Sequence, residues 1–129
     1  MPPRVLVIED DQDVSDMIRA VLESEGYTVA VARDGADGLL FGREWRPDLI
    51  LLDINLPKVQ GETLLRLFRE DDSTRETPMI AMSASATIRR QSERLRAADA
   101  ALSKPFDIET LLAQVAFHLA RRPPSQEPE

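Results

Sequence analysis

Residues 49–57 read LILLDINLP, and the first four of these residues decide the fold. They are apolar on both faces of a strand, which predicts a strand buried on both sides, as in a parallel sheet covered by helices. Similar apolar runs occur at residues 5–8, 28–32, 79–82 and 100–102. The chain is therefore expected to form five strands.

Amphipathic stretches with helical spacing separate the strands. The first contains Val14 to Leu22, with Asp13 as the expected N-cap and Gly26 as the residue that ends the helix. Further apolar residues at helical spacing fall within residues 36–40, 64–68 and 108–119, and a basic helix is expected to begin near Thr87. Each strand is thus followed by a helix.

Five strands alternating with five helices predict an α/β fold, a doubly wound parallel sheet covered on both faces. Right-handed crossovers favour the strand order 2-1-3-4-5. We expect residues 1–120 to form one domain and the proline-rich residues 121–129 to be a disordered tail or a linker stub. In such sheets, ligands bind beyond the carboxyl ends of the strands.

Composition excludes several classes of function. The 129 residues carry a net charge of −7, which disfavours non-specific binding to DNA or to anionic membranes. The chain has no cysteine, which excludes disulfides, thiolate catalysis and cysteine metal sites. No apolar run approaches the length of a membrane span, and the N-terminus lacks the apolar core of a signal peptide, so a cytoplasmic location is expected.

Polar side chains follow four of the predicted strands at the edge where ligands bind. Glu9, Asp10 and Asp11 follow the first strand, and Asp53 follows the third. Two carboxylates about 4 Å apart repel by roughly 4 kcal/mol at an effective dielectric near 20, so such a cluster needs protons or a cation. Mg²⁺ is suited to carboxylate oxygens supplemented by phosphate oxygens. The acids therefore predict half of a metal site, which Asp53 completes.

The fourth and fifth strands add a hydroxyl, Ser83, and a cation, Lys104. A lysine ammonium is a compact charge that suits a phosphate oxygen, and a serine hydroxyl donates one hydrogen bond to the same group. A carboxylate nucleophile, a metal, a lysine and a hydroxyl are the groups needed to form an aspartyl phosphate. For Asp11, helix capping and a role in the site are equally good interpretations.

The stretches VLVIEDD, LILLDINLPKVQG, MIAMSA and LSKPF, in this order, resemble the receiver domain of two-component response regulators over residues 4–120. The resemblance implies a flavodoxin-like receiver fold in which Asp53 is the phosphoacceptor and Ser83 and Lys104 assist it. It also implies a cis peptide bond at Lys104-Pro105. The implied metal is Mg²⁺, with Mn²⁺ as a substitute, and its implied ligands are Glu9, Asp10, Asp53 and the main-chain carbonyl of Asn55.

By this resemblance, the expected function is Mg²⁺-dependent transfer of a phosphoryl group to Asp53 from the phosphohistidine of a sensor histidine kinase or phosphotransfer protein. The chain is then a signalling domain that catalyses only its own phosphorylation and dephosphorylation. The implied partners are a downstream protein or an absent output domain, with a weak homodimer as a further state. Direct binding to nucleic acid or membrane is not expected.

Other interpretations share parts of this pattern. An FMN-binding protein has the same architecture, but the acids after the first strand would repel its phosphate. A phosphatase with an aspartate nucleophile needs a second acid where this chain has Asn55. A pseudo-receiver that acts by binding alone, or a receiver cut from a larger regulator, remains an alternative. One departure from the family is Ala101, which stands where most receivers carry an aromatic residue.

Overall fold

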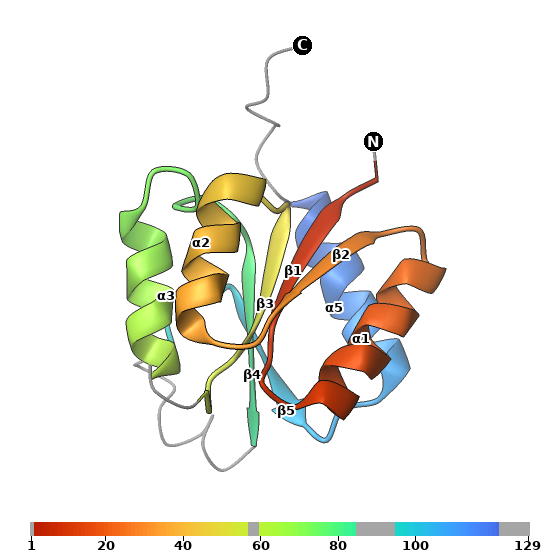
Figure 1. Ribbon diagram of the computed structural model, residues 1–129. Coiled ribbons are helices and arrows are strands. Elements are labelled where there is room, and N and C mark those ends of the chain that lie inside the picture. Colours follow the sequence, from red (N-terminus) through yellow and green to blue (C-terminus); the bar gives the residue numbers. More distant parts are fainter. Residues whose placement is uncertain (1, 57–59, 85–94, 122–129) are drawn as a thin grey trace.

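The computed structural model describes residues 2–56, 60–84 and 95–121 and confirms the predicted parallel sheet and its strand order, β2-β1-β3-β4-β5 (Figure 1). The strands are β1 (Arg4–Ile8), β2 (Thr28–Ala32), β3 (Leu49–Asp53), β4 (Met79–Ala84) and β5 (Ala100–Lys104). The helices are α1 (Gln12–Ser24), α2 (Gly35–Trp45), α3 (Gly61–Glu70) and α5 (Ile108–Ala120). Within the described residues there are therefore four of the five predicted helices. The basic helix expected near Thr87 and the tail from residue 122 lie outside them.

The sheet is the middle layer of three. Helices α1 and α5 cover one face, and α2 and α3 cover the other (Figure 1). Successive residues of β1 point to opposite faces, so that Val5 and Val7 pack with α1 and α5 while Leu6 and Ile8 pack with α2 and α3. All five residues of β3 are buried, as the sequence predicts. Each fully buried aliphatic side chain stabilises the fold by roughly 1.5–3 kcal/mol.

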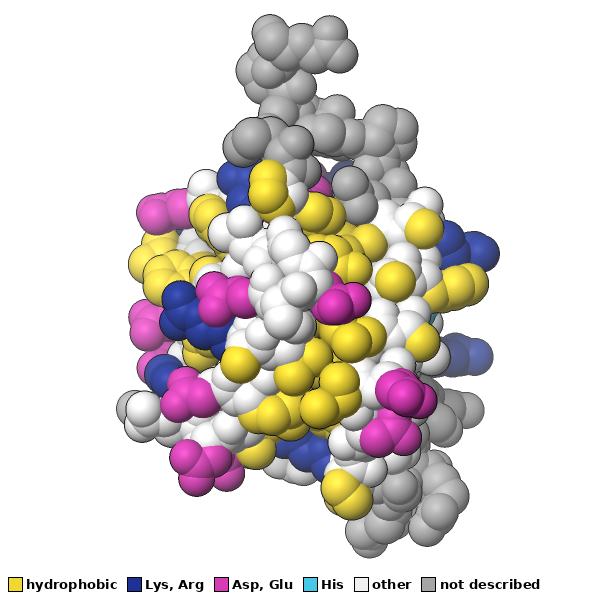
Figure 2. Space-filling view, turned by 90° about the vertical axis from the view of Figure 1, so that its right-hand side faces the viewer, with side chains coloured by type: hydrophobic (Ala, Val, Ile, Leu, Met, Phe, Trp, Pro, Cys, Tyr) yellow, Lys and Arg dark blue, Asp and Glu magenta, His cyan; other side chains and the backbone are white. Residues whose placement is uncertain are grey.

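Helix α5 buries fewer of its apolar side chains than its sequence pattern suggests. In α5 the predicted apolar face includes Ile108 and Ala116, but both are exposed, whereas Leu111, Val115 and Leu119 are buried. Hydrophobic side chains accordingly gather on the side of α1 and α5 in Figure 2. The large exposed members from these two helices are Met17, Ile108 and Phe117. None of the described helices is long and apolar enough to cross a membrane.

The ends of several elements differ from the predicted ones. Helix α1 begins at Gln12, and its N-cap is Asp11, whose side chain accepts a hydrogen bond from the Val14 amide at 3.1 Å. Asp13, the predicted cap, lies instead in the first turn. Strand β5 continues two residues beyond the predicted end, because Ser103 and Lys104 remain in register with β4. Gly26, which has φ +92°, follows the end of α1 as predicted.

The edge of the sheet formed by the amino ends of the strands carries its own polar network. Arg69, near the end of α3, donates to the carbonyl oxygens of Ala97, Arg75 and Thr77 and to Asp99 Oδ2, at 2.8–2.9 Å. Asp99 Oδ2 also accepts from the Met79 amide at the start of β4. This network joins α3 to the segments that lead into β4 and β5.

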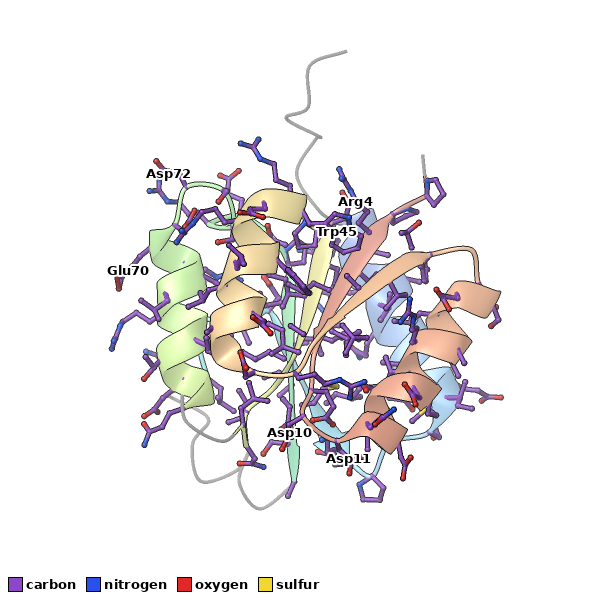
Figure 3. The ribbon with its side chains drawn as sticks, viewed as in Figure 1. Arg4, Asp10, Asp11, Trp45, Glu70 and Asp72 are labelled. Atoms are coloured by element: carbon purple, nitrogen blue, oxygen red, sulfur yellow. The ribbon has the colours of Figure 1, made fainter. Side chains whose placement is uncertain are left out.

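The only tryptophan of the chain, Trp45, lies at this same edge. The guanidinium carbon of Arg4 is 5.9 Å from the centre of its ring, a cation–π contact. Figure 3 shows this pair at one end of the sheet and Asp10 and Asp11 at the other. The tryptophan and the predicted metal site are thus at opposite ends of the strands.

Candidate functional site

The carboxyl ends of four strands bring the predicted site residues together. Glu9 directly follows β1, Asp53 ends β3, Ser83 lies in β4 and Lys104 ends β5. The sheet register aligns them, because Asp53 pairs with Met82, the residue before Ser83, and Ala84 pairs with Lys104. The parallel arrangement therefore collects groups that are up to 95 positions apart in the chain.

Lys104 is the cation at the centre of this site. Its ammonium donates to Glu9 Oε1 at 2.7 Å and to Asp53 Oδ2 at 3.4 Å. Burial lowers the pKa of Lys104, but the bonds and charges of Glu9 and Asp53 outweigh burial and hold this pKa above its usual value. The ammonium is therefore charged at neutral pH and is shared between two acids. The peptide bond that follows it, Lys104-Pro105, is cis, as expected.

Glu9 lies where its surroundings destabilise the ionised carboxylate. Its side chain is fully buried, and Oε2 has no hydrogen-bond partner. Burial, followed by the bond and charge of Asp53, raises the pKa of Glu9 to about 7, and Lys104 offsets only part of this rise. A buried polar atom without a partner costs free energy, so Oε2 indicates a missing positive or hydrogen-bonding group.

Three acids of this site could together bind a cation. Single carboxylate oxygens of Glu9, Asp10 and Asp53 lie within 4.8 Å of one another. Asp10 is exposed, whereas Asp53 is only 4% exposed, so the cluster opens to solvent on one side. An all-oxygen set of carboxylates with room for water fits Mg²⁺ or Mn²⁺. The residues present therefore suit the metal that the sequence predicts. A cation bound here would also give the buried Glu9 Oε2 a partner.

Asn55 makes contacts on both sides of the site. Its backbone amide donates to Asp53 Oδ1 at 2.9 Å, which fixes one carboxylate oxygen while the other faces Lys104. Its side-chain amide donates to Ser83 Oγ at 3.1 Å. The family resemblance implied a role for the main-chain carbonyl of Asn55 as a metal ligand. The side-chain bond to Ser83 was not predicted, because it joins residues 28 positions apart in the chain.

Close backbone packing joins the turn directly after β3 to the start of α3. The Ile54 amide donates to the Met82 carbonyl at 3.0 Å, and the Gly61 amide donates to the Ile54 carbonyl at 3.2 Å. A Cβ at Gly61 would lie 2.5 Å from the Cα of Ile54, which is closer than packing allows. Glycine is therefore required for α3 to begin so close to the turn that carries Asn55.

Arg33 and Ser15 form a second contact that the sequence did not reveal. Ser15 is fully buried in the first turn of α1, where its hydroxyl accepts from Arg33 Nη1 at 2.8 Å and donates to the Gln12 carbonyl at 3.1 Å. Arg33 directly follows β2, and Ala32 accepts a bond from the Glu9 amide at 3.0 Å. Together with the Asp11 cap, these contacts hold the loop that carries the acids. For Asp11, the structure thus supports capping.

Ala101 is exposed on β5. The alanine side chain ends at Cβ and has no rotamer to change, so β5 lacks at this position the aromatic side chain that most receivers carry. The loop after Ser83 extends into residues outside those that the structure describes.

Comparisons with known proteins match this chain to one family. The family model "Response regulator receiver domain" matches residues 5–116. The DNA-binding dual master transcriptional regulator RpaA of Synechocystis sp. is 40% identical over 120 residues, which cover 92% of this chain and 50% of that protein. The polar-differentiation response regulator DivK of Brucella anthropi is 35% identical over 121 residues, covering 92% of this chain and 98% of that protein. The chain thus spans about half the length of RpaA and nearly all of DivK.

A solved structure with the same fold contains a metal ion. The receiver domain of sensor histidine kinase PA1611 from Pseudomonas aeruginosa superimposes with a TM-score of 0.85 and 29% sequence identity, covering 93% of this chain and 99% of that one. That structure has a magnesium ion coordinated in its active site cleft. In the part of this chain that the structure describes, the acidic cluster of Glu9, Asp10 and Asp53 suits such an ion.

Proposed function

The chain belongs to the response regulator receiver family, and on that basis we propose that it accepts one phosphoryl group on Asp53 in a Mg²⁺-dependent reaction. The observation that supports this most directly is the contact between Lys104 and two acids, 2.7 Å from Glu9 Oε1 and 3.4 Å from Asp53 Oδ2. A buried carboxylate beside an ammonium and a hydroxyl is equipped for nucleophilic attack on phosphorus. The donor is the phosphohistidine of a sensor histidine kinase or a phosphotransfer protein.

The residues divide the work of the transfer. An oxygen of Asp53 forms the new O–P bond as the P–N bond of the donor breaks, and the departing imidazole nitrogen retains the bonding electrons. The Asn55 amide holds Asp53 Oδ1, which leaves Oδ2 toward Lys104. Lys104 then moves its hydrogen bond to a phosphoryl oxygen, and Ser83 donates to another.

Glu9, Asp10, Asp53 and the carbonyl of Asn55 are the groups that would hold the metal. When bound, Mg²⁺ neutralises the carboxylates and withdraws charge from the phosphoryl oxygens. Asp53 and Glu9 both lie at the buried side of the cluster, while Asp10 is exposed. This difference suits a cation that enters from solvent and remains partly hydrated.

Phosphorylation of Asp53 then changes the contacts of this chain with a downstream protein or with an output domain outside this chain. Several relatives, including RpaA, are about twice as long as the part that this chain matches. The absence of direct nucleic-acid binding remains a prediction, because the name of RpaA describes it as DNA-binding. A pseudo-receiver is the alternative, and it differs in one property: it takes no phosphoryl group.

Intact mass spectrometry tests the proposal. The protein is incubated with acetyl phosphate and Mg²⁺, and we expect the mass increment of one phosphoryl group, absent with EDTA and absent in Asp53→Asn. Asp11→Asn is the matched control, because it also removes one nearby negative charge yet preserves an N-cap residue. A wild-type protein that gains no mass, or an Asp53→Asn protein that gains it at the same rate, would contradict the proposal.

A further inference from the structure

The contact between Asn55 and Ser83 carries information beyond the proposed transfer. Ser83 is fully buried, whereas Asn55 is exposed, and the amide Nδ2 of Asn55 lies 3.1 Å from Ser83 Oγ. The backbone amide of the same residue binds Asp53 Oδ1. One residue therefore touches both the proposed phosphoacceptor and the hydroxyl that is expected to contact the phosphoryl group.

The direction of this hydrogen bond determines what the hydroxyl can do. A serine hydroxyl has one proton to donate and two lone pairs that accept. Because the Asn55 amide donates, it occupies a lone pair of Oγ and leaves the Ser83 proton available to another acceptor. Donation into a hydroxyl also polarises its O–H bond and strengthens the bond that it donates.

We infer that Asn55 is a positioning residue for Ser83. Its side-chain amide holds the Ser83 hydroxyl so that the proton is directed away from Asn55 and toward a phosphoryl oxygen on Asp53. This inference rests on the proposed function, and it assigns the side chain of Asn55 a role separate from that of its main-chain carbonyl. Ser83 is the group that contacts the phosphoryl oxygen, and Asn55 acts through it.

The geometry allows this role to be isolated. Both the bond to Asp53 and the predicted metal ligand of residue 55 are main-chain groups, so Asn55→Ala preserves them and removes only the side-chain contact. Loss of one hydrogen bond between neutral groups corresponds to about a 2- to 10-fold change in rate. We expect Asn55→Ala to slow phosphorylation by that factor without changing the Mg²⁺ concentration that gives the half-maximal rate.

A double-mutant cycle tests the inference. The phosphorylation rates of wild type, Asn55→Ala, Ser83→Ala and the double variant are measured by intact mass over a range of acetyl phosphate concentrations. We expect Asn55→Ala to lower the maximal rate in the wild-type background and to have no effect once Ser83 is alanine. The concentration of acetyl phosphate at half-maximal rate should stay the same, which a general loss of structure would not predict.

Three outcomes would overturn the inference: effects that multiply in the double variant, an unchanged or faster rate in Asn55→Ala, or a shift in the Mg²⁺ midpoint alone. In each of these, wild-type protein is still phosphorylated on Asp53, so the proposed function stands. If wild-type protein takes no phosphoryl group, the proposed function fails, and this inference fails with it.

Discussion

Arg69 and Lys104 are two cations of similar exposure at opposite ends of the sheet, and their surroundings differ sharply. The Arg69 side chain is 24% exposed and that of Lys104 is 28% exposed. Arg69 donates to three carbonyl oxygens and one carboxylate. Lys104 faces Glu9 and Asp53 and leaves Glu9 Oε2 without a partner.

The difference distinguishes a cation that belongs to a structural network, Arg69, from the cation of the proposed phosphoryl site, Lys104. The planar guanidinium of Arg69 has a partner for four of its five N–H groups. The site around Lys104 has more negative than positive charge in the described contacts, which costs stability until a cation or a phosphoryl group changes the balance. An incomplete set of partners thus marks the edge where chemistry is expected.

The largest effect should come from Lys104→Met. Its loss removes the ammonium from the proposed phosphoryl site, and removal of one such electrostatic group lowers rates by at least about 100-fold. Arg69→Met should leave the phosphorylation rate within about twofold, because its contacts lie at the other end of the strands. Initial rates of mass increase with acetyl phosphate compare the two. Equal losses of rate would remove the distinction.

The second effect concerns stability, and here the substitution of Arg69 matters. Arg69→Met deletes four hydrogen bonds and should lower the free energy of unfolding by about 2–4 kcal/mol. Arg66→Met is the matched control, since among the described residues Arg66 pairs with Glu70 on the surface of the same helix, and its loss should cost less than about 1 kcal/mol. Urea unfolding measures both, and similar values for the two variants would show that the network contributes little.

A third effect depends on pH. The pKa of Glu9 rises from 4.5 to about 7 on folding, so its contribution to stability is complete below pH 4.5 and is lost as pH rises through 7. Glu9→Gln removes this titration, and we expect the variant to gain about 2 kcal/mol relative to wild type between pH 5 and pH 8 in EDTA. Urea unfolding at several pH values would detect it. A difference that is independent of pH would show that Glu9 is ionised in the free protein.

The smallest effect is that of the metal on stability. A ligand that binds only the native state at ten times its dissociation constant stabilises that state by about 1.4 kcal/mol. Mg²⁺ should therefore raise the melting temperature of wild type, and Asp10→Asn should abolish this rise while making the metal-free protein more stable. Thermal unfolding with Mg²⁺ or EDTA provides the measurement. A melting temperature that does not respond to millimolar Mg²⁺ would contradict the assignment of the acidic cluster.

Much of this organisation is visible in the sequence, because it depends on local pattern. The apolar run at residues 49–52 predicts a central, doubly covered strand, and the polar residues after each strand predict one edge. The N-cap of α1 was placed two residues late, since Asp11 and Asp13 are equally suitable caps. The predicted β5 omitted Ser103 and Lys104, because these polar residues do not continue the apolar run and belong to the strand only through their pairing with β4.

Other features depend on contacts that no local pattern encodes. Arg69 lies in an ordinary amphipathic helix, and its partners at positions 75, 77, 97 and 99 become neighbours only when α3 packs beside β4. The bond from Asn55 to Ser83 likewise requires β3 and β4 to be adjacent and in register. The exposure of Ile108 and Ala116 could not be foreseen, since helical spacing does not tell how much of an apolar face is covered.

The position of Trp45 has a consequence for optical spectroscopy. It precedes β3, whose residues Leu49 to Asp53 add roughly 13 Å of strand between the indole and the acidic edge. We therefore expect the emission of Trp45 to report the loss of packing around Trp45 and Arg4 during unfolding, and to be unchanged by Mg²⁺ or by the proposed phosphorylation of Asp53. Trp45 should thus report whether the chain is folded and not whether Asp53 carries a phosphoryl group.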